Sequence, residues 1–460
     1  MSRFDALPSL YANHYFPKEG SAMIKTQKRE IFRGLLVVAC CLLLSAGCKK
    51  DDSTATGPGT PGPGATITVS GKVIGSNNQP QSGVPVLIIG TSIPSVNTDA
   101  NGNFTISNVT TPYNIAVVDG ASKASLVYKG LTRSDPTLMW IDVAPGTPRT
   151  ATLNGKIYPA TAYPEPPTRK SKAAFASPEL NASTNVNGTT GAYSINATWY
   201  GPTTTTGTVY ALQWSYNTTT NLPTSYDGFG SRSGVSLLDA TTNPNGNDTM
   251  SVVSSATFSG NVTVASGYTL NSKSLSVMFA NNGIISLFSD PTPSSSFSYL
   301  TPDAPGATMF LSASASKPSG QSSAFRVGLS PSATGVALSV PAAPELSLPI
   351  DATTGVTKSS LFSWTPVTGG IQVVIFQAGA GKPRYLVLTA AAADSIPDLT
   401  AAGLGLPAAT AYTWSVYSFG PFASADAAAG ASGFLGALVG LFTSDGYTGR
   451  SSIRSFTTAP

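Results

Sequence analysis

The side chains with the most versatile chemistry in this chain, those of cysteine and histidine, all lie within the first 48 residues. They are His14, Cys40, Cys41 and Cys48. A chain cut before Cys48 keeps 413 residues, one cysteine and no histidine. It cannot build a Ser-His-Asp triad, a Cys-His pair, a zinc site of Cys and His, or a histidine-ligated haem. We therefore expect no catalytic residues, no metal, no cofactor and no disulfide within the cut chain.

Paired carboxylates are the hydrolytic chemistry that remains. Glycoside cleavage needs two of them about 5–10 Å apart and requires neither His nor Cys. The only glutamates after Cys48 are Glu165, Glu179 and Glu345. Glu165 and Glu345 stand beside prolines in apparent linkers. A carboxylate-dependent carbohydrate-active enzyme is therefore a hypothesis that no sequence motif supports.

A short acidic and amide-rich run could hold calcium. Asp99, Asn101 and Asn103 are spaced as at the start of an EF-hand loop. The sixth position of such a loop should be Gly and is Phe104, and the twelfth should be Glu and is Thr110. The pattern favours a turn built from Asn, Asp and Gly.

Cys48 stands at the end of an export signal. Basic residues precede an apolar run of ten residues, Leu35–Leu44, which is too short to span a bilayer. The ending Leu44, Ser45, Ala46, Gly47, Cys48 resembles the lipobox of bacterial lipoproteins. That resemblance implies that Cys48 carries lipid and becomes the N-terminus of a membrane-anchored chain. The alternative is an ordinary cleaved signal with a chance cysteine.

The segment before Met23 fits no targeting pattern, so we interpret residues 1–22 as a misannotated extension and residues 23–47 as the signal peptide. Six basic and three acidic residues precede Cys48, which leaves 20 basic and 19 acidic residues and a net charge of +1, against +4 for the whole chain. Nucleic-acid binding needs a concentrated basic face, and this balance provides none.

A charged and then Gly/Pro-rich stretch, residues 48–64, links the anchor to the first domain. Lys49-Lys50-Asp51-Asp52 resembles the surface-export tag of Bacteroidetes-type lipoproteins, and the alternative is a solvated charged linker. The tag would place the chain on the outer face of the outer membrane; without it, the periplasmic face is the alternative. Residues 53–64 read as a flexible linker.

Alternating polar and apolar residues then predict strands, and we place the first domain at residues 65–152. The order V-S-G-K-V, G-V-P-V-L-I, T-D-A-N-G-N-F-T-I and Y-N-I-A-V over residues 66–120 resembles the carboxypeptidase-regulatory-like domain. This resemblance implies a transthyretin-like β-sandwich of about seven strands without catalytic residues.

Residues 153–340 show short alternating strands between Gly/Pro/Asn turns, which predicts one large sandwich or two small ones. Gly155-Lys156-Ile157 repeats Gly71-Lys72-Val73, and residues 258–264 echo it more loosely. These are either starts of repeated units or simply a common strand opening. Tyr226 and Phe229 lie in an expected loop, where exposed rings would be candidates for binding sugar; the alternative for the region's aromatics is a core position.

Residues 341–460 resemble a fibronectin type III-like domain. Trp364 stands where that family buries a tryptophan, and Leu406 and Tyr412 match its tyrosine corner, in which a phenol bonds back to the backbone. An apolar insertion at residues 423–447 departs from the family. It either folds back onto the sandwich, as a short helix, or exposes a contact patch. The candidate contact residues are Phe434, Leu435, Leu438 and Phe442.

These features together predict an all-β chain of tandem antiparallel β-sandwich domains after a lipoprotein signal peptide and a flexible linker. The favoured function is a non-catalytic surface lipoprotein used for binding or cell-envelope contacts. Its expected partners are the membrane, through the lipid, and a polysaccharide or an envelope protein. The alternative is a component of an outer-membrane assembly that captures and takes up glycans.

Overall fold

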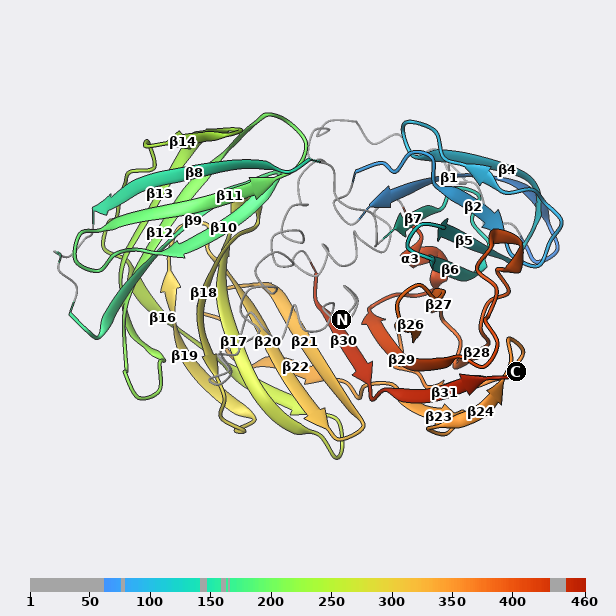
Figure 1. Ribbon diagram of the computed structural model, residues 1–460. Helices are drawn as coiled ribbons and strands as arrows, with labels where there is room; N and C mark the ends of the chain where they lie inside the picture. The colour runs from blue at the N-terminus through green and yellow to red at the C-terminus, as the bar shows by residue number, and fades with distance from the viewer. Residues whose placement is uncertain (1–61, 76–78, 141–146, 159–162, 164–165, 431–443) are drawn as a thin grey trace, which may run out of the picture.

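The computed structural model describes residues 62–75, 79–140, 147–158, 163, 166–430 and 444–460 (Figure 1). Their regular structure is almost entirely β-strand, which confirms the predicted fold class. No described helix is long and apolar enough to cross a membrane. Several predicted sites lie outside the described residues: Leu44, Ser45, Ala46, Gly47, Cys48, Phe434, Leu435, Leu438 and Phe442.

The first sandwich, called unit 1 (residues 66–140), has seven strands in two sheets. One sheet has the order β4-β1-β7 and the other the order β3-β2-β5-β6. Strand β1 pairs antiparallel with β4 and parallel with β7. The strands are β1 (Thr66–Gly75), β2 (Pro85–Ile88), β3 (Val96–Asn97), β4 (Asn103–Thr110), β5 (Tyr113–Asp119), β6 (Ala124–Leu131) and β7 (Thr137–Trp140).

The same topology occurs twice more, in unit 2 (residues 149–249) and unit 3 (residues 254–340). The sheet orders are β11-β8-β14 with β10-β9-β12-β13, and β19-β16-β22 with β18-β17-β20-β21. The strands of unit 2 are β8 (Arg149–Tyr158), β9 (Arg169–Ser177), β10 (Leu180–Asn185), β11 (Ala192–Trp199), β12 (Thr204–Tyr216), β13 (Pro223–Leu238), β14 (Thr241–Asn243) and β15 (Asp248–Thr249). Those of unit 3 are β16 (Ser254–Val264), β17 (Thr269–Phe279), β18 (Gly283–Asp290), β19 (Ser296–Asp303), β20 (Thr308–Lys317), β21 (Gly320–Leu329) and β22 (Val336–Val340).

One glycine marks the first strand of each repeated unit. Gly71, Gly155 and Gly260 lie in β1, β8 and β16. In each unit this first strand pairs in parallel with a strand near the unit's end. A Cβ atom at any of the three glycines would come closer than 3.0 Å to a backbone atom in or just before that parallel strand. Only glycine allows this approach. Of the two alternatives for the Gly-Lys openings, this geometry favours starts of repeated units, and residues 153–340 lie in two sandwiches rather than one.

The C-terminal sandwich, unit 4 (residues 345–458), has a different topology. One of its sheets has the strand order β23-β25-β28. Strands β26, β27, β29, β30 and β31 belong to the second sheet. The elements are β23 (Glu345–Leu348), β24 (Thr353–Val356), β25 (Phe362–Thr365), β26 (Ile371–Ala378), β27 (Arg384–Thr389), β28 (Ala393–Asp394), β29 (Ala411–Gly420), α3 (Ala425–Ala428), β30 (Gly446–Ser451) and β31 (Arg454–Thr458).

Unit 4 joins units 1 and 3 into one fourteen-stranded sheet. Strand β27 pairs parallel with β6 of unit 1, and β30 pairs antiparallel with β21 of unit 3. Figure 1 shows the red and orange strands of unit 4 between the blue unit 1 and the yellow unit 3. Unit 4, the last of the four units, therefore lies next to unit 1.

Several strands are buried on both faces because sheets are shared between cores. Residues of β5, β6, β26 and β27 point alternately into two hydrophobic cores that each combine unit 1 with unit 4. Strands β9 and β12 likewise separate the core of unit 2 from a core shared with unit 3. These strands read as continuous apolar runs, such as Val373–Phe376, as expected for strands covered on both sides.

The predicted domain boundaries need two corrections. The boundary at residue 152 falls inside β8, which belongs to unit 2, so the first unit ends earlier. Residues 341–460 also do not form a module with a core of their own, because that core includes Ala116, Val118 and Val127 of unit 1. A boundary drawn from turns and linkers cannot detect strands that pair across hundreds of residues.

Candidate functional site

The predicted aromatic binding residues do not lie in a loop. Tyr226 and Phe229 belong to β13, and this corrects the expectation of exposed rings. The Tyr226 ring is buried beside Trp214. Phe229 stacks on Phe279 of unit 3 with ring centroids 5.1 Å apart, and Phe279 stacks on Tyr210. These rings therefore pack the contact between units 2 and 3, which is the core alternative.

The predicted structural residues of unit 4 are in its core. Trp364 is buried in β25, and Leu406 packs against the same cluster. The Tyr412 phenol donates to a backbone carbonyl, as expected, but the acceptor is Pro383 at 3.0 Å, 29 residues upstream. A tyrosine corner bonds only a few residues upstream, so this detail of the prediction is wrong. It is Tyr385 that donates to Leu404, in the segment before Tyr412, at 2.9 Å.

The acidic candidates have structural partners. Asp99 accepts the backbone N–H groups of Asn101 and Asn103 through Oδ1, both at 2.8 Å, which confirms the turn. Glu179 accepts from Thr205 in unit 2, and Glu345 pairs with Lys317 of unit 3. Glu165 lies outside the described residues. Within the described part of the chain, no group of three or more His, Cys, Asp or Glu side chains is placed to hold a metal.

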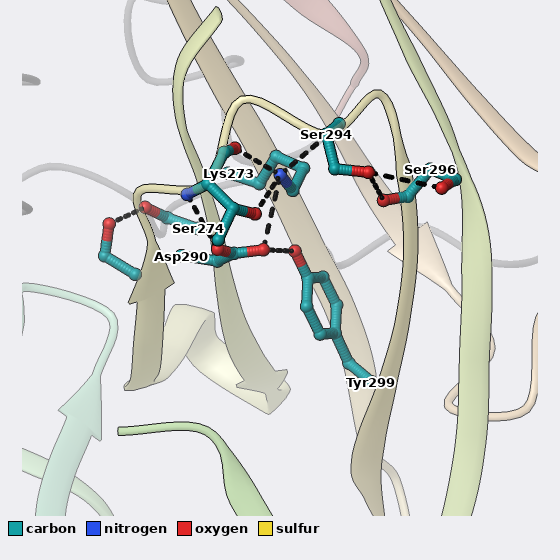
Figure 2. Close-up of polar contacts among 8 residues, drawn as sticks. Lys273, Ser274, Asp290, Ser294, Ser296 and Tyr299 are labelled. Carbon is teal, nitrogen blue, oxygen red and sulfur yellow. Dashed lines mark hydrogen bonds and ion pairs between the residues drawn. The ribbon is translucent and has the colours of Figure 1, made fainter. Parts of the chain in front are cut away.

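The most deeply buried ionic cluster lies in unit 3 and was not found from the sequence. Lys273 in β17 and Asp290 at the end of β18 are directly opposite in the antiparallel register. Their side chains are 0% and 8% exposed, and Nζ lies 3.3 Å from Oδ2. Tyr299, from β19 in the opposite sheet, donates to the same Oδ2 at 2.6 Å. Figure 2 shows these three side chains converging between the two sheets.

The Lys273 ammonium also holds the connection between β18 and β19. It donates to the carbonyl oxygens of Thr292 at 2.8 Å and Ser294 at 2.9 Å, and it lies 3.2 Å from the Thr292 hydroxyl. Asp290 Oδ1 accepts the Thr292 N–H at 2.9 Å. A lysine has three N–H bonds, and these acceptors use all of them. The amine is therefore not available as a nucleophile.

The electrostatics of the cluster agree with this structural role. Burial raises the pKa of the Asp290 carboxyl, but hydrogen bonds from Tyr299 and Thr292 and the charge of Lys273 outweigh it, so the pKa lies below its ordinary value. Burial and the bond to Asp290 raise the pKa of Tyr299, which keeps its phenol protonated as a donor. The cluster is thus a fixed ion pair that ties two sheets and one loop together.

A second group of polar contacts lies where unit 4 meets its neighbours. Asp426, in α3, accepts the N–H of Thr132 at 2.9 Å, the Thr132 hydroxyl at 2.5 Å and the N–H of Arg133 at 3.2 Å. Asp445, just before β30, accepts from Arg326 Nε at 3.1 Å and the Val327 N–H at 2.9 Å. The two carboxylates lie near the two ends of the insertion, where Asp426 binds unit 1 and Asp445 binds unit 3. No sequence motif marks either.

Comparison with known proteins assigns no family to this chain. No protein-family model matches the chain, and no curated protein matches it. Among solved structures, it is similar to the Bacillus anthracis TIE protein at 7% identity and a TM-score of 0.15, over 60% of this chain and 50% of that one. The chain thus spans about half the length of that structure.

Two further solved structures match parts of the chain. The FN1–FN3 domains of chicken CNTN1 match at 12% identity and a TM-score of 0.17, over 68% of this chain and all of theirs. A DUF3823 family protein from Bacteroides uniformis matches at 10% identity and a TM-score of 0.12, over 38% of this chain and all of that one. At these TM-scores the likenesses carry no argument about the fold or the function of this chain.

Proposed function

We propose that this chain is a non-catalytic surface lipoprotein whose four β-sandwich units form a stiff scaffold for binding or for contacts within the cell envelope. The observation that carries the proposal is the fourteen-stranded sheet that runs through units 3, 4 and 1. Tandem domains joined only by linkers move relative to one another. Units whose strands pair in one sheet and whose hydrophobic cores are shared hold their surfaces in fixed positions instead.

The start of the described chain is consistent with a tether that ends at unit 1. The Gly62 carbonyl accepts from the Thr111 hydroxyl at 2.8 Å, and the Gly64 N–H donates to the Thr111 carbonyl at 2.7 Å. In a chain anchored at Cys48, a pulling force on the tether would thus act on unit 1 first. The polar residues that an enzyme would need free, such as Glu179, Glu345 and Lys273, are instead bonded to neighbours.

Protease shaving of intact cells tests the surface location. The full precursor carries a C-terminal epitope, and a periplasmic protein serves as the control. We expect the epitope to disappear while the control protein survives. If the epitope is cut only after the outer envelope is opened, the surface location is wrong and a periplasmic role replaces it. Turnover of any substrate by the purified soluble part would contradict the non-catalytic role.

A further inference from the structure

Units 1 and 4 contact each other through a continuous strand pair, although more than 200 residues separate them in the chain. Arg384 to Leu388 in β27 lie opposite Ala124 to Tyr128 in β6 in parallel register. The Arg384 N–H donates to the Lys123 carbonyl at 2.8 Å, at the end of the pair. The main chain of unit 4 thus completes the hydrogen bonding at one edge of unit 1.

The two units also share apolar interiors. Ile371, Leu386 and Phe419 of unit 4 lie in the core that contains β1 and β5–β7 of unit 1. Ala425 and Ala428 of α3 are buried in that same core. The Thr137 N–H at the start of β7 donates to the Ala429 carbonyl at 2.9 Å. The described start of the insertion therefore folds onto the core that units 1 and 4 share.

Two acidic side chains fasten the margins of this contact. Asp426 accepts three hydrogen bonds from Thr132 and Arg133, and Arg133 Nη1 donates to the Asp426 carbonyl at 2.7 Å. Asp394 in β28 pairs with Lys129 in β6 at 2.9 Å, with both side chains largely buried. Hydrogen bonds to charged groups are among the stronger ones in proteins.

We propose that unit 4 is a clasp that holds unit 1 onto the rest of the molecule independently of the chain between units 1 and 2. Backbone pairing, shared cores and the Asp426 contacts all bind unit 1 to a segment more than 200 residues further along. A chain cut between units 1 and 2 therefore stays together. For an anchored protein this means that cleavage at that point does not release units 2–4 from the cell.

A cleavable full-length chain tests the clasp. A specific protease sequence replaces residues 141–146, which lie outside the described residues, in the complete soluble chain. After cutting, we expect the N-terminal fragment to co-elute with the C-terminal fragment in native size-exclusion chromatography. Separation of the two fragments would overturn the proposal. It would leave the surface location unaffected, because that is decided by shaving of intact cells.

Two matched variants show whether unit 4 makes the contact. Asp426→Ala removes the side-chain hydrogen bonds between unit 4 and unit 1 at this position. Asp445→Ala removes the corresponding hydrogen bonds between unit 4 and unit 3. In the cut chain, Asp426→Ala should raise the rate at which the N-terminal fragment leaves by about tenfold or more, since each 1.4 kcal/mol is a factor of ten. Asp445→Ala should leave that rate unchanged. Equal rates for both variants and the parent would overturn the clasp.

A third variant keeps the test informative should Asp426→Ala fail to fold. Asp394→Asn weakens the ion pair with Lys129, 2.9 Å across the same contact, and retains the shape of the side chain. It should also speed release of the cut fragment. If the release rate of this variant equals that of the parent, the ion pair between Lys129 and Asp394 does not help to hold unit 1, and this part of the proposal is wrong.

Discussion

At the scale of single residues, the pair of Lys273 and Asp290 shows what a charged side chain buried between two sheets requires. Removing two charges from water is costly, and only close partners and further hydrogen bonds offset that cost. Lys273 has three oxygen acceptors besides Asp290, and Asp290 has two donors besides Lys273. Loss of one member leaves the other buried without its partner.

The variant Lys273→Met should lower the free energy of unfolding by about 3–5 kcal/mol, because it leaves the Asp290 carboxylate buried and unpaired. Lys358→Met is the matched control, since Lys358 forms a pair with Asp398 in which the side chains are 57% and 46% exposed. The control should lose only about 0–1 kcal/mol. Chemical denaturation of each full chain measures both, and equal losses would contradict a structural role for the cluster.

At the scale of elements, the repeated units depend on a glycine at the point where the first strand meets its parallel partner. In unit 3, Gly260 stands opposite Val336 in the parallel register. A Cβ there would meet the Val336 backbone rather than a side chain that could move away. The Gly-Lys dipeptides of units 1 and 2 and the Gly-Asn dipeptide of unit 3 therefore meet the same geometric requirement, which applies to the glycine alone.

The variant Gly260→Ala should destabilise unit 3 by about 1–3 kcal/mol or more, because the backbone of β22 must shift to accept the new methyl group. Gly120→Ala is the control, since a Cβ at Gly120 meets nothing within 4 Å. Thermal unfolding compares the two variants with the parent. An unchanged melting temperature for Gly260→Ala would show that the close approach in β16 is not required.

At the scale of the whole molecule, the order of units in space differs from their order in the chain. Unit 4 lies between units 3 and 1, and it contributes to the cores of unit 1. Unit 2 differs, because the core around Leu153 and Ile195 contains only its own residues and those just after β15. The stability of unit 1 should therefore depend on unit 4, while the core of unit 2 should not.

A chain ending at residue 340 tests this dependence. Without unit 4, Leu126 and Val127 of β6 lose the strand and core that cover them. We expect the amides of β6 to lose their protection in hydrogen–deuterium exchange, while those of β12, near Ala211, keep it. Equal protection of β6 in the full and the shortened chain would show that unit 1 is stable alone.

The sequence alone was enough to predict much of the local structure, although it placed Tyr226 and Phe229 in a loop rather than in β13. Period-two alternation and Gly/Pro/Asn turns predict strands, and the turn at Asp99 follows from its side chain accepting nearby backbone N–H groups. The Gly-Lys segments offered repeated units as one of two alternatives, and Trp364 is buried as its motif implies. These features depend on neighbours within a few residues, so the chain specifies them directly.

Only the tertiary structure decided which strands share a sheet. Residues 384–388 pair with residues 124–128, and no local pattern encodes a partner so far away. Tyr226 and Phe229 lie in β13 because it pairs with the neighbouring strand β12, and the packing of unit 2 on unit 3 brings the Phe229 ring onto Phe279. One sequence signal was available, since continuous apolar runs such as Val373–Phe376 indicate burial on both faces. Burial on two faces shows that a second layer exists, but not which residues form it.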